Sequence, residues 1–271
     1  MELSIIVTSY KIPHLLSLCL EAIQNNVTIK YEIIVADSAT EEATRDLIKE
    51  NFPQVKFLAN KKNVGFLRLV NQSLDIAKGK YFFIINGDII LQKDSVEKML
   101  DFLKKHPEVG MLGPQLINFD GSVQPSCFRF YRPITIFYRR AKFFKKNPWV
   151  KKELDWFLMK DKIKTKENYW EADWIMGSAM LVTRQAVEKV GKMDERFFMY
   201  MEDVDWCWRF WQQGFKVIYY PLAKVFHYHG KKSAGKSFFY DLLFNKYTHI
   251  HIISGIKFFL KHWKEKSPHQ S

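Results

Sequence analysis

The sequence predicts an α/β fold in which a Rossmann-like, mostly parallel central sheet is flanked by helices. Within residues 1–100, short runs that are apolar nearly throughout alternate with helical patterns of roughly ten to fifteen residues. Such strands are typical of a parallel sheet that is covered on both faces. The composition, 47% hydrophobic and 16% aromatic over 271 residues, allows a substantial core and excludes a disordered chain.

The expected strands cover residues 3–9, 31–37, 55–59 and 80–87, and a helix follows each of the first three. The second of these helices has an acidic start and spans residues 41–50. The other two are indicated by apolar residues at helical spacing, which are Leu15, Leu16, Cys19, Ala22 and Ile23 in one and Phe66, Val70, Leu74 and Ala77 in the other.

The regular alternation ends after one more helix. Asp94 is expected to cap that helix, with Glu97 completing a capping box. Gly, Pro and an Asp-Gly turn interrupt the short extended runs of residues 109–130, which favours antiparallel strands. A further strand pattern leads to Thr183, which begins a short helix that ends at Gly191. No internal repeat or low-complexity linker is present, so one continuous domain with a C-terminal helical appendage is expected.

The formal net charge of +13 indicates a polyanionic partner such as nucleic acid, anionic lipid or a phosphorylated substrate. No RNP-like, zinc-finger or helix-turn-helix signature is present, and clustered acids would repel phosphates, so we expect no nucleic acid partner.

The sequence also bears on where the protein is located. The N-terminus has the pattern of a strand and not of a signal peptide, and no run reaches the ~18 to 20 apolar residues of a membrane span. The three cysteines have no CxxC spacing, which fits a reducing compartment. A cytoplasmic protein, soluble or peripheral on the inner face of the membrane, is therefore expected.

Two segments combine Lys or Arg with aromatic residues. Residues 139–166 carry eleven basic against three acidic residues. They fit either a solvated helical surface or a surface for a membrane or an anionic acceptor. Residues 238–266 fit an amphipathic helix at an anionic membrane, or else a packing helix or a homodimer contact.

Polar clusters follow three of the expected strands, at the edge where open parallel sheets bind ligands. They are Thr8-Ser9-Tyr10, Asp37-Ser38 and Asn86-Gly87-Asp88. Asp37 suits a turn or helix cap as well as a ligand contact. Asp88 could bind Mg²⁺ or Mn²⁺, which prefer hard oxygen ligands, although Gly-Asp is also a common turn.

A second cluster of acids lies in the segment FFMYMEDVDWCWRFWQQG, residues 197–214. Its apolar spacing predicts a helix that begins at Glu202 and Asp203 and ends at Gly214. Asp205 has a structural partner four residues on, in Arg209. An acidic first turn explains one carboxylate, whereas an apolar wall beside three acids suits a general base with a raised pKa.

Residues 219–230 form an extended run in which His227 and His229 alternate, so both side chains should point the same way. Either histidine alone would more often be structural. The pair, downstream of the acid cluster, indicates a metal or phosphate site.

Taken in order, the segments LSIIVTSYK, EIIVADSAT, KNVGFLRLVNQSL, YFFIINGDIIL, GSAMLVTRQAVEKVGKMDERFFMYMEDVDWCWR and VFHYHGKKS resemble family 2 glycosyltransferases. The resemblance spans about residues 3–235 and is closest to the rhamnosyltransferase-like branch of bacterial surface polysaccharide synthesis. It implies a GT-A fold, a nucleotide-diphosphate sugar donor, Mg²⁺ or Mn²⁺, and inversion at the anomeric carbon. The acceptor would be a saccharide or a lipid-linked sugar, and the donor sugar could be rhamnose.

By the same resemblance, Asp203 matches the catalytic base with Glu202 beside it, and Asp88 and His227 match metal contacts. Asp37 matches the acid that contacts the donor base. The donor side as a whole would comprise Thr8, Ser9, Tyr10, Asp37, Ser38, Asn63, Gly65, Arg68, Asn71, Asn86 and Gly87, and the acceptor side Trp174, Gly177 and Ser178. The chain departs from the family pattern in having NGD for the usual NPD, Arg68 where small residues are common, and DSAT in place of an Asp-Asn turn.

The expected organisation is a GT-A domain over residues 1–235 and an amphipathic helical extension over residues 236–271. Within the domain, residues 1–115 would bind the nucleotide and residues 116–235 would hold the acceptor and the catalytic groups. The alternatives are a noncatalytic sugar-nucleotide-binding protein, which the acids at 88, 202 and 203 disfavour, and a nucleic-acid-binding protein.

Overall fold

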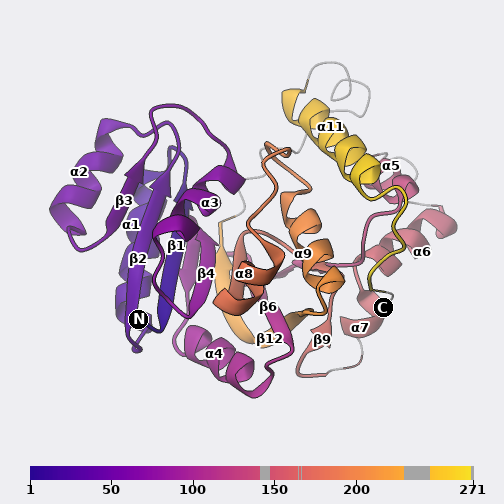
Figure 1. Cartoon of the computed structure of the whole chain (residues 1–271), viewed down its shortest axis with the longest axis horizontal. Helices are drawn as coiled ribbons and strands as arrows, with labels where there is room; N and C mark the ends of the chain where they lie inside the picture. Colours follow the sequence, from indigo (N-terminus) through magenta and orange to yellow (C-terminus); the bar gives the residue numbers. More distant parts are fainter. Residues whose placement is uncertain (141–146, 164, 166, 229–244, 270–271) are drawn as a thin grey trace.

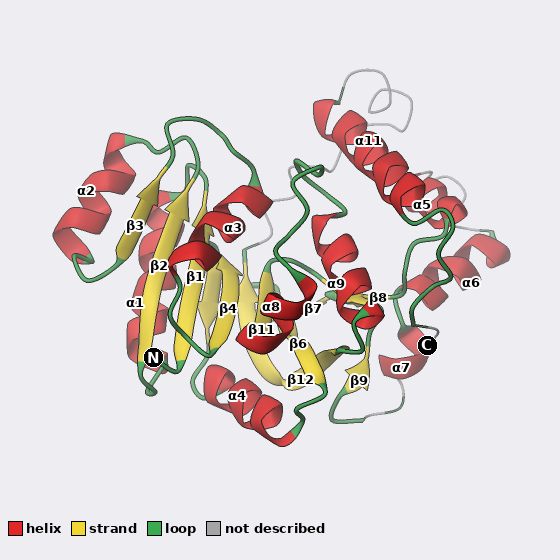
Figure 2. Ribbon diagram, viewed as in Figure 1, coloured by secondary structure: helices red, strands yellow, loops and turns green. Residues whose placement is uncertain are grey.

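A computed structural model describes residues 1–140, 147–163, 165, 167–228 and 245–269. One mixed sheet forms its centre, with helices on both faces and a group of helices at one side (Figures 1 and 2). His229 lies outside the described residues, so the expected pairing of its side chain with His227 stays a prediction.

The first four long strands form the parallel half of the sheet, in the order β3-β2-β1-β4. Their bounds are β1 Leu3–Ser9, β2 Tyr31–Asp37, β3 Lys56–Ala59 and β4 Tyr81–Asn86. All four were expected from the sequence. Their order puts the carboxyl ends of β1, β2 and β4 next to one another.

The second half of the sheet mixes directions. β11 (Ala179–Thr183) runs antiparallel between β4 and β6 (Val109–Ile117), whereas β12 (Lys216–His227) runs parallel to β6. The antiparallel additions expected within residues 109–130 are present: β7 (Val123–Gln124) pairs with β6, and β8 (Cys127–Phe128) pairs with β10 (Trp174–Ile175). β9 (Trp170–Glu171), which was not expected, pairs antiparallel with β12.

Alternate residues of the strands enter two separate cores, as the twofold repeat of a strand requires. Ile5 and Ile33 belong to the core that is covered by α1, α2 and α4, and Ile6 and Ile34 to the core that is covered by α3, α8 and α9. The bounds of these helices are α1 Pro13–Asn26, α2 Glu42–Asn51, α3 Phe66–Ile76, α4 Ser95–Lys105, α8 Arg184–Val190 and α9 Glu202–Gln212. The predicted helical faces of α1 and α3 are confirmed except at Leu15 and Phe66, which are only partly buried.

The start of α4 corrects one expectation. Asp94 adopts a left-handed conformation with φ of 60°, and its side chain makes no capping hydrogen bond. Glu97 instead accepts the N–H and the hydroxyl of Thr28, at 2.8 and 3.0 Å. The capping box is therefore wrong, because Glu97 is used to hold the end of α1 and not the start of its own helix.

A second unexpected strand lies just after β4. β5 (Ile89–Leu91) follows β4 directly and pairs antiparallel with the end of β12. It is only three residues long, too short for a pattern of alternation to be seen. Its pairing with β12 nevertheless fixes the position of Asp88, the residue just before it.

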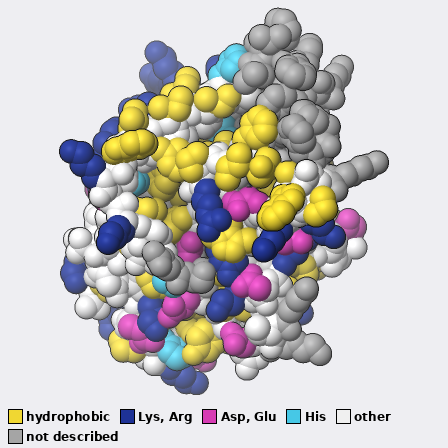
Figure 3. Space-filling model, turned by 90° about the vertical axis from the view of Figure 1, so that its right-hand side faces the viewer, with side chains coloured by type: hydrophobic (Ala, Val, Ile, Leu, Met, Phe, Trp, Pro, Cys, Tyr) yellow, Lys and Arg dark blue, Asp and Glu magenta, His cyan; other side chains and the backbone are white. Residues whose placement is uncertain are grey.

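The remaining helices form the right-hand side of the molecule in Figure 1. They are α5 Pro133–Arg140, α6 Pro148–Phe157, α7 Lys160–Ile163 and α11 Lys246–Lys261. Phe258 of α11 is buried in the core beneath α9, while hydrophobic side chains also gather on the outer surface of this side (Figure 3). No helix in the described ranges has the length and apolar character to cross a bilayer.

Candidate active site

The ends of β1, β2 and β4 meet at one edge of the sheet. In the β1–β2 register Ser9 is paired with Asp37. In the β1–β4 register Thr8 is paired with Asn86, and its hydroxyl donates to the Asn86 side-chain oxygen at 3.1 Å. The N–H of Gly87 donates to the Thr8 carbonyl oxygen at 2.8 Å. The three polar clusters expected from the sequence are thus brought together.

A network of side-chain contacts joins the end of β2 to the loop before α3. The Ser38 hydroxyl donates to Asn63 Oδ1 at 3.2 Å and accepts the N–H of Val64 at 2.9 Å. Asn63 Oδ1 also accepts the N–H of Gly65 at 3.0 Å. Ser38 and Asn63 therefore hold this loop beside Asp37.

Three other residues predicted on the donor side have different surroundings. Tyr10 is exposed just after β1. Arg68 lies at the surface, where its Nε is 3.4 Å from a carboxylate oxygen of Glu195. The Asn71 amide is buried, donating to the Met193 carbonyl oxygen at 2.9 Å and accepting the Met193 N–H at 3.1 Å. Asn71 thus has a clear role in the fold, and donor contacts of these three stay predictions.

Asp88 and His227 come together because β5 and β12 are paired. Ile89 lies opposite His227 in this ladder, and the N–H of Tyr228 donates to the Asp88 carbonyl oxygen at 3.0 Å. Asp88 Oδ1 and His227 Nε2 are 3.5 Å apart. The two residues predicted as metal contacts are therefore neighbours.

The second ring nitrogen of His227 determines which tautomer faces Asp88. His227 Nδ1 lies 2.9 Å from Oε1 of Gln124, an oxygen that can only accept, so Nδ1 donates. A neutral imidazole then has its lone pair on Nε2, toward Asp88. Histidines that bind metals commonly have this arrangement, with the other nitrogen donating to an oxygen. Nothing in the sequence singled out Gln124.

The acid cluster lies at the start of α9, as expected. Asp203 accepts the N–H of Val204 at 2.9 Å and of Gly177 at 3.0 Å. Burial raises the pKa of Asp203, and these two donors counteract the rise. Burial also raises the pKa of Glu202 to about 8, with the charge of Asp203 adding to the effect. Burial thus disfavours the ionised form of both acids, and at Asp203 the two N–H donors favour it.

Gly177 and Ser178 join the acid cluster to the strand ends. The Ser178 carbonyl oxygen accepts the N–H of Asn86 at 3.0 Å, while the neighbouring Gly177 N–H donates to Asp203. A Cβ at position 177 would stand 3.2 Å from the ring of Phe66 and 3.5 Å from the Asp203 Cβ. Through the backbone of Gly177 and Ser178, hydrogen bonds thus connect Asp203 of α9 to Asn86 at the end of β4.

Several buried oxygen atoms in this region make no well-formed hydrogen bond. Within the described part of the chain, nine buried side-chain nitrogen or oxygen atoms lack a hydrogen bond, and six are at this site. They are Ser9 Oγ, both carboxylate oxygens of Asp37, Asp88 Oδ1, Ser178 Oγ and Glu202 Oε2. Each such atom costs about 1 to 3 kcal/mol, so native proteins keep them where something else supplies the partner. The arrangement suits a polar ligand that offers cationic or donor groups.

Comparison with known proteins identifies the family. Residues 4–191 match the model of the glycosyl transferase family 2, more than half of the chain. The chain belongs to glycosyl transferase family 2. The predicted GT-A fold is confirmed by solved glycosyltransferases. α9, with Glu202 and Asp203, follows the matched range.

Two relatives of this glycosyltransferase are rhamnosyltransferases. It is 29% identical, over 217 residues, to the N-acetylglucosaminyl-diphospho-decaprenol L-rhamnosyltransferase of Mycobacterium tuberculosis, covering 75% of this chain and 68% of that protein. It is 39% identical over 56 residues to the rhamnosyltransferase WbbL of Escherichia coli, covering 21% of each chain.

Two solved structures have the same fold at low sequence identity. GalNAc-T7 with UDP, GalNAc and Mn²⁺ has a TM-score of 0.66 at 13% identity, and the match covers 98% of this glycosyltransferase but only 49% of that chain. The mannosyltransferase PcManGT from Pyrobaculum calidifontis, in complex with GDP-Man and Mn²⁺, has a TM-score of 0.58 at 16% identity and is covered to 76%. At these identities the likeness shows the fold alone.

The residues predicted on the acceptor side of this glycosyltransferase divide into two groups. Gly177 and Ser178 lie in the site, as described above. Trp174 is buried, stacked on Phe128 at a centroid distance of 4.3 Å, and its Nε1 donates to the Arg129 carbonyl oxygen at 2.9 Å. Its packing is that of a core residue, and acceptor contacts of all three stay predictions.

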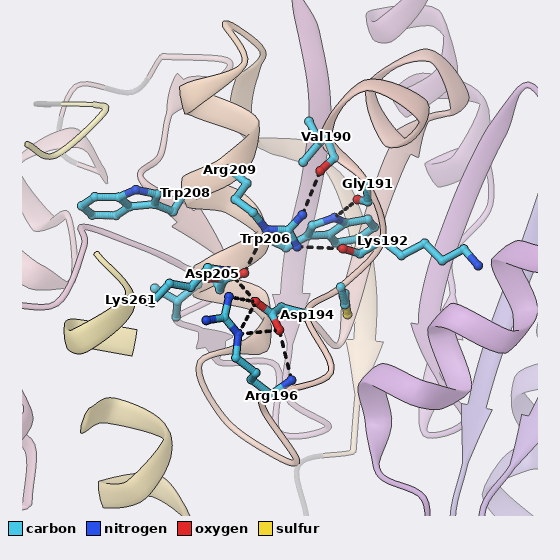
Figure 4. Close-up of polar contacts among 12 residues, drawn as sticks. Val190, Gly191, Lys192, Asp194, Arg196, Asp205, Trp206, Trp208, Arg209 and Lys261 are labelled. Atoms are coloured by element: carbon cyan, nitrogen blue, oxygen red, sulfur yellow. Dashed lines mark hydrogen bonds and ion pairs between the residues drawn. The ribbon is translucent and has the colours of Figure 1, made fainter. Parts of the chain in front are cut away.

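Asp205 is the buried centre of a separate cluster on α9. It accepts from Arg209 Nε at 2.9 Å, as expected, and also contacts Lys261 Nζ at 2.6 Å (Figure 4) and His262 Nε2 at 2.9 Å. Burial raises the pKa of Asp205, but the hydrogen bond from His262 and the charges of Arg209 and Lys261 lower it overall. The two C-terminal partners were missed, because His262 is 57 residues further along and no local spacing points to it.

The same cluster connects α9 to α11 and to the end of α8 with the loop that follows it (Figure 4). Arg209 also donates to the carbonyl oxygens of Val190 and Lys192, at 2.9 and 2.8 Å. Lys261 reaches a second carboxylate, Asp194, at 2.7 Å. The end of α8, the loop after it and α11 are therefore all held to the helix that carries Asp203.

Gly65 lets the loop before α9 approach the start of α3. It has φ of +83° and ψ of 160°, and an added Cβ would lie 2.7 Å from the carbonyl oxygen of Phe198. We expect Gly65→Ala to lower the free energy of unfolding by about 1 to 3 kcal/mol, since this conformation is nearly restricted to glycine. Thermal unfolding measures the change.

Gly121→Ala provides the control for backbone strain without contact. Gly121 has φ of +82°, but nothing lies within 4 Å of an added Cβ. It should lose less stability than Gly65→Ala. Equal losses in the two variants would show that the close approach to Phe198 contributes nothing.

Proposed function

We propose that the protein is a metal-dependent, inverting glycosyltransferase of cell-surface polysaccharide synthesis. It would move a sugar, with rhamnose as the first candidate, from a nucleotide-diphosphate donor to a hydroxyl group of a saccharide or lipid-linked acceptor. The candidate sugar and acceptor come from the mycobacterial relative, whose name specifies an L-rhamnosyl transfer to a diphospho-decaprenol-linked N-acetylglucosamine.

The observation that carries the proposal is the gathering of buried oxygens that lack a hydrogen bond between the strand ends and α9. Asp37 and Ser9 lie where a nucleoside could supply hydroxyl and N–H donors. Asp88 lies at the neighbouring strand end, and Glu202 and Asp203 lie beyond Gly177. A donor bound across these groups would have its base near Asp37 and its sugar near Asp203.

Asp88 and His227 fit a divalent cation. Asp88 Oδ1 is buried without a hydrogen bond, and His227 Nε2 faces it from 3.5 Å. No group of three or more His, Cys, Asp or Glu side chains that could hold a metal occurs among the described residues, so the diphosphate and water would complete the coordination. When bound, Mg²⁺ or Mn²⁺ would neutralise charge on the diphosphate leaving group.

Asp203 supplies the base in this proposal. Its carboxylate takes the proton of the acceptor hydroxyl while that oxygen bonds to the anomeric carbon. The bond from the anomeric carbon to the diphosphate oxygen breaks, and its electron pair leaves with the nucleoside diphosphate. Attack and departure take place on opposite faces, so the configuration inverts. In this proposal Glu202, whose pKa is raised to about 8, keeps its proton, and Asp203 is the member of the pair that accepts one.

A nucleotide-sugar panel tests the function. The protein is heated with dTDP-rhamnose, UDP-sugars or GDP-mannose, with and without Mn²⁺, because a ligand that binds the native state raises the melting temperature. The stabilising donor is then incubated with a diphospholipid-linked N-acetylglucosamine acceptor, and transfer is followed by release of the nucleotide. We expect metal-dependent stabilisation and transfer with one donor class. Stabilisation without transfer or hydrolysis would favour the noncatalytic sugar-nucleotide binder.

The raised pKa of Glu202 predicts a pH-dependent stability. The pKa of Glu202 in the native state is raised to about 8, whereas its usual value is 4.5. Between these values the native state binds more protons than the unfolded state. The free energy of unfolding should therefore fall as the pH rises through this window, by up to about 1.4 kcal/mol per pH unit. Glu202→Gln, which resembles the protonated acid, should flatten this slope.

Denaturant titrations at pH values between about 5 and 8 measure the slope for each variant. Glu188→Gln, at an exposed carboxylate of α8, is the matched control and should keep the wild-type slope. Identical slopes in wild type and Glu202→Gln would contradict the assignment of a proton to Glu202.

A further inference from the structure

The outer face of α11 has an exposed apolar stripe. Ile253, Ile256, Leu260 and Trp263, which we call the α11 stripe, are spaced as one face of a helix and the turn that follows it. Leu260 is 68% exposed and Trp263 79%. The opposite face of the same helix is buried at Thr248, Ser254, Gly255 and Phe258. Large apolar side chains on the solvent side of a packed helix indicate a binding surface.

The contacts of the inner face prevent the stripe from turning inward. Ser254 donates its hydroxyl to the Met199 carbonyl oxygen at 2.8 Å, and Lys261 and His262 bind the buried Asp205. Phe258 packs edge-on to Trp208 of α9 at a centroid distance of 5.7 Å. The stripe therefore keeps a fixed orientation relative to the helix that carries Asp203.

Neighbouring helices extend the apolar surface. Gly255 allows α5 to lie close, since a Cβ there would be 3.4 Å from the Ile136 side chain. Ile134 and Phe137 are exposed on α5, and Trp149 is exposed at the start of α6. Figure 3 views this side of the molecule and shows hydrophobic side chains gathered on its upper part, with Lys and Arg and some Asp and Glu side chains around them.

The charge on this surface is positive. Lys246, Lys257, Lys264 and Lys266 are exposed along and just beyond α11. The acid among them, Glu265, is engaged by Trp208 and His262. A second copy of the chain placed on the stripe by a twofold axis would bring lysines against lysines, which disfavours a homodimer contact here. An anionic lipid surface has the opposite charge and accepts the apolar side chains.

We propose that the α11 stripe docks on an anionic membrane, with α11 lying in the plane of the interface. Apolar side chains would enter the acyl boundary while the lysines meet lipid phosphates. This inference rests on the proposed function only where it explains what docking achieves, which is to bring Asp203 to an acceptor carried by a lipid. Binding itself needs neither donor nor acceptor.

Vesicle co-sedimentation of the full chain tests the proposal. Wild type is mixed with vesicles of phosphatidylcholine alone or with phosphatidylglycerol, at low and high salt. We expect binding to the anionic vesicles that weakens with salt, and at least tenfold weaker binding by Leu260→Glu/Trp263→Glu. Lys264→Gln/Lys266→Gln should weaken it roughly fivefold for each lysine lost.

Leu18→Glu is the matched control, because Leu18 is 50% exposed on α1, which covers the sheet and does not belong to the surface of α11, α5 and α6. It should bind as wild type does. All variants are first compared by melting temperature and by donor-induced stabilisation, so that loss of fold is recognised. Wild-type binding by the Leu260→Glu/Trp263→Glu protein would overturn the proposal, as would equal binding to neutral vesicles. A dimer in sedimentation velocity that this double variant abolishes would assign the stripe to a second copy instead.

The two inferences fail separately. Loss of vesicle binding with transfer to a water-soluble acceptor intact would show that the stripe serves the membrane and not the chemistry. Vesicle binding by a protein that binds no nucleotide sugar would contradict the proposed function and leave the docking surface in place.

Discussion

Asp203→Asn is expected to lower kcat for sugar transfer by about 10²- to 10⁴-fold, the usual contribution of a positioned general base. The substitution removes the basic oxygen and leaves a side chain of the same size, whose carbonyl oxygen can still accept the amide of Gly177 or Val204. The fold and the donor site should therefore persist. Single-turnover transfer measures the rate, and donor-induced thermal stabilisation measures binding.

The comparison variant is Asp46→Asn, at an exposed acid of α2, which should transfer sugar at the wild-type rate. Glu202→Gln should keep much more activity than Asp203→Asn, because Glu202 is already protonated near neutral pH. Full activity of Asp203→Asn would remove Asp203 from the role of base. A larger loss in Glu202→Gln than in Asp203→Asn would move that role to Glu202.

Asp88→Asn is expected to weaken metal-dependent donor binding by roughly 100-fold or more. Changes in groups that only support a metal ligand typically cost 10- to 100-fold, and a direct carboxylate ligand should cost at least as much. The amide keeps the shape of the β4–β5 turn, whose backbone contact to Tyr228 does not involve the side chain. Calorimetric titration of the donor with and without Mn²⁺ measures the loss.

Donor affinity without metal should be the same in wild type and Asp88→Asn, which separates a metal ligand from a direct donor contact. Asp101→Asn, at an exposed acid of α4, is the control and should retain the metal effect. His227→Gln should have a smaller effect than Asp88→Asn, because it removes a nitrogen ligand and no charge. An unchanged response of Asp88→Asn to Mn²⁺ would contradict the metal site at the end of β4.

The parallel half of the fold could be predicted because its signals are local. Strands such as LSIIVTS are buried on both faces, and the helices between them show a 3.6-residue repeat in Val70 and Leu74 of α3 and their neighbours. The second half mixes strand directions and contains strands of two or three residues. Local patterns cannot specify such strands, because their partners decide where they form.

The candidate site divides in the same way. Polar residues at strand ends could be identified from the order of strands, which is why Thr8, Asp37 and Asn86 were expected at one edge. The hydrogen bond of Gln124 to His227 and the binding of Asp205 by Lys261 join residues far apart in the chain. Neither leaves a spacing in the sequence, so only the folded chain reveals them.

The cluster around Asp205 has a practical meaning for anyone who shortens the protein. A version that stops before Lys261 would remove two of the three partners of Asp205, Lys261 and His262, and leave only Arg209 beside this buried carboxylate. Asp205 is two positions from Asp203. Removing the C-terminal residues for crystallisation would thus destabilise α9, the helix that carries Asp203. Solubility is better sought by replacing Leu260 and Trp263, whose side chains point to solvent, while every residue of the tail is retained.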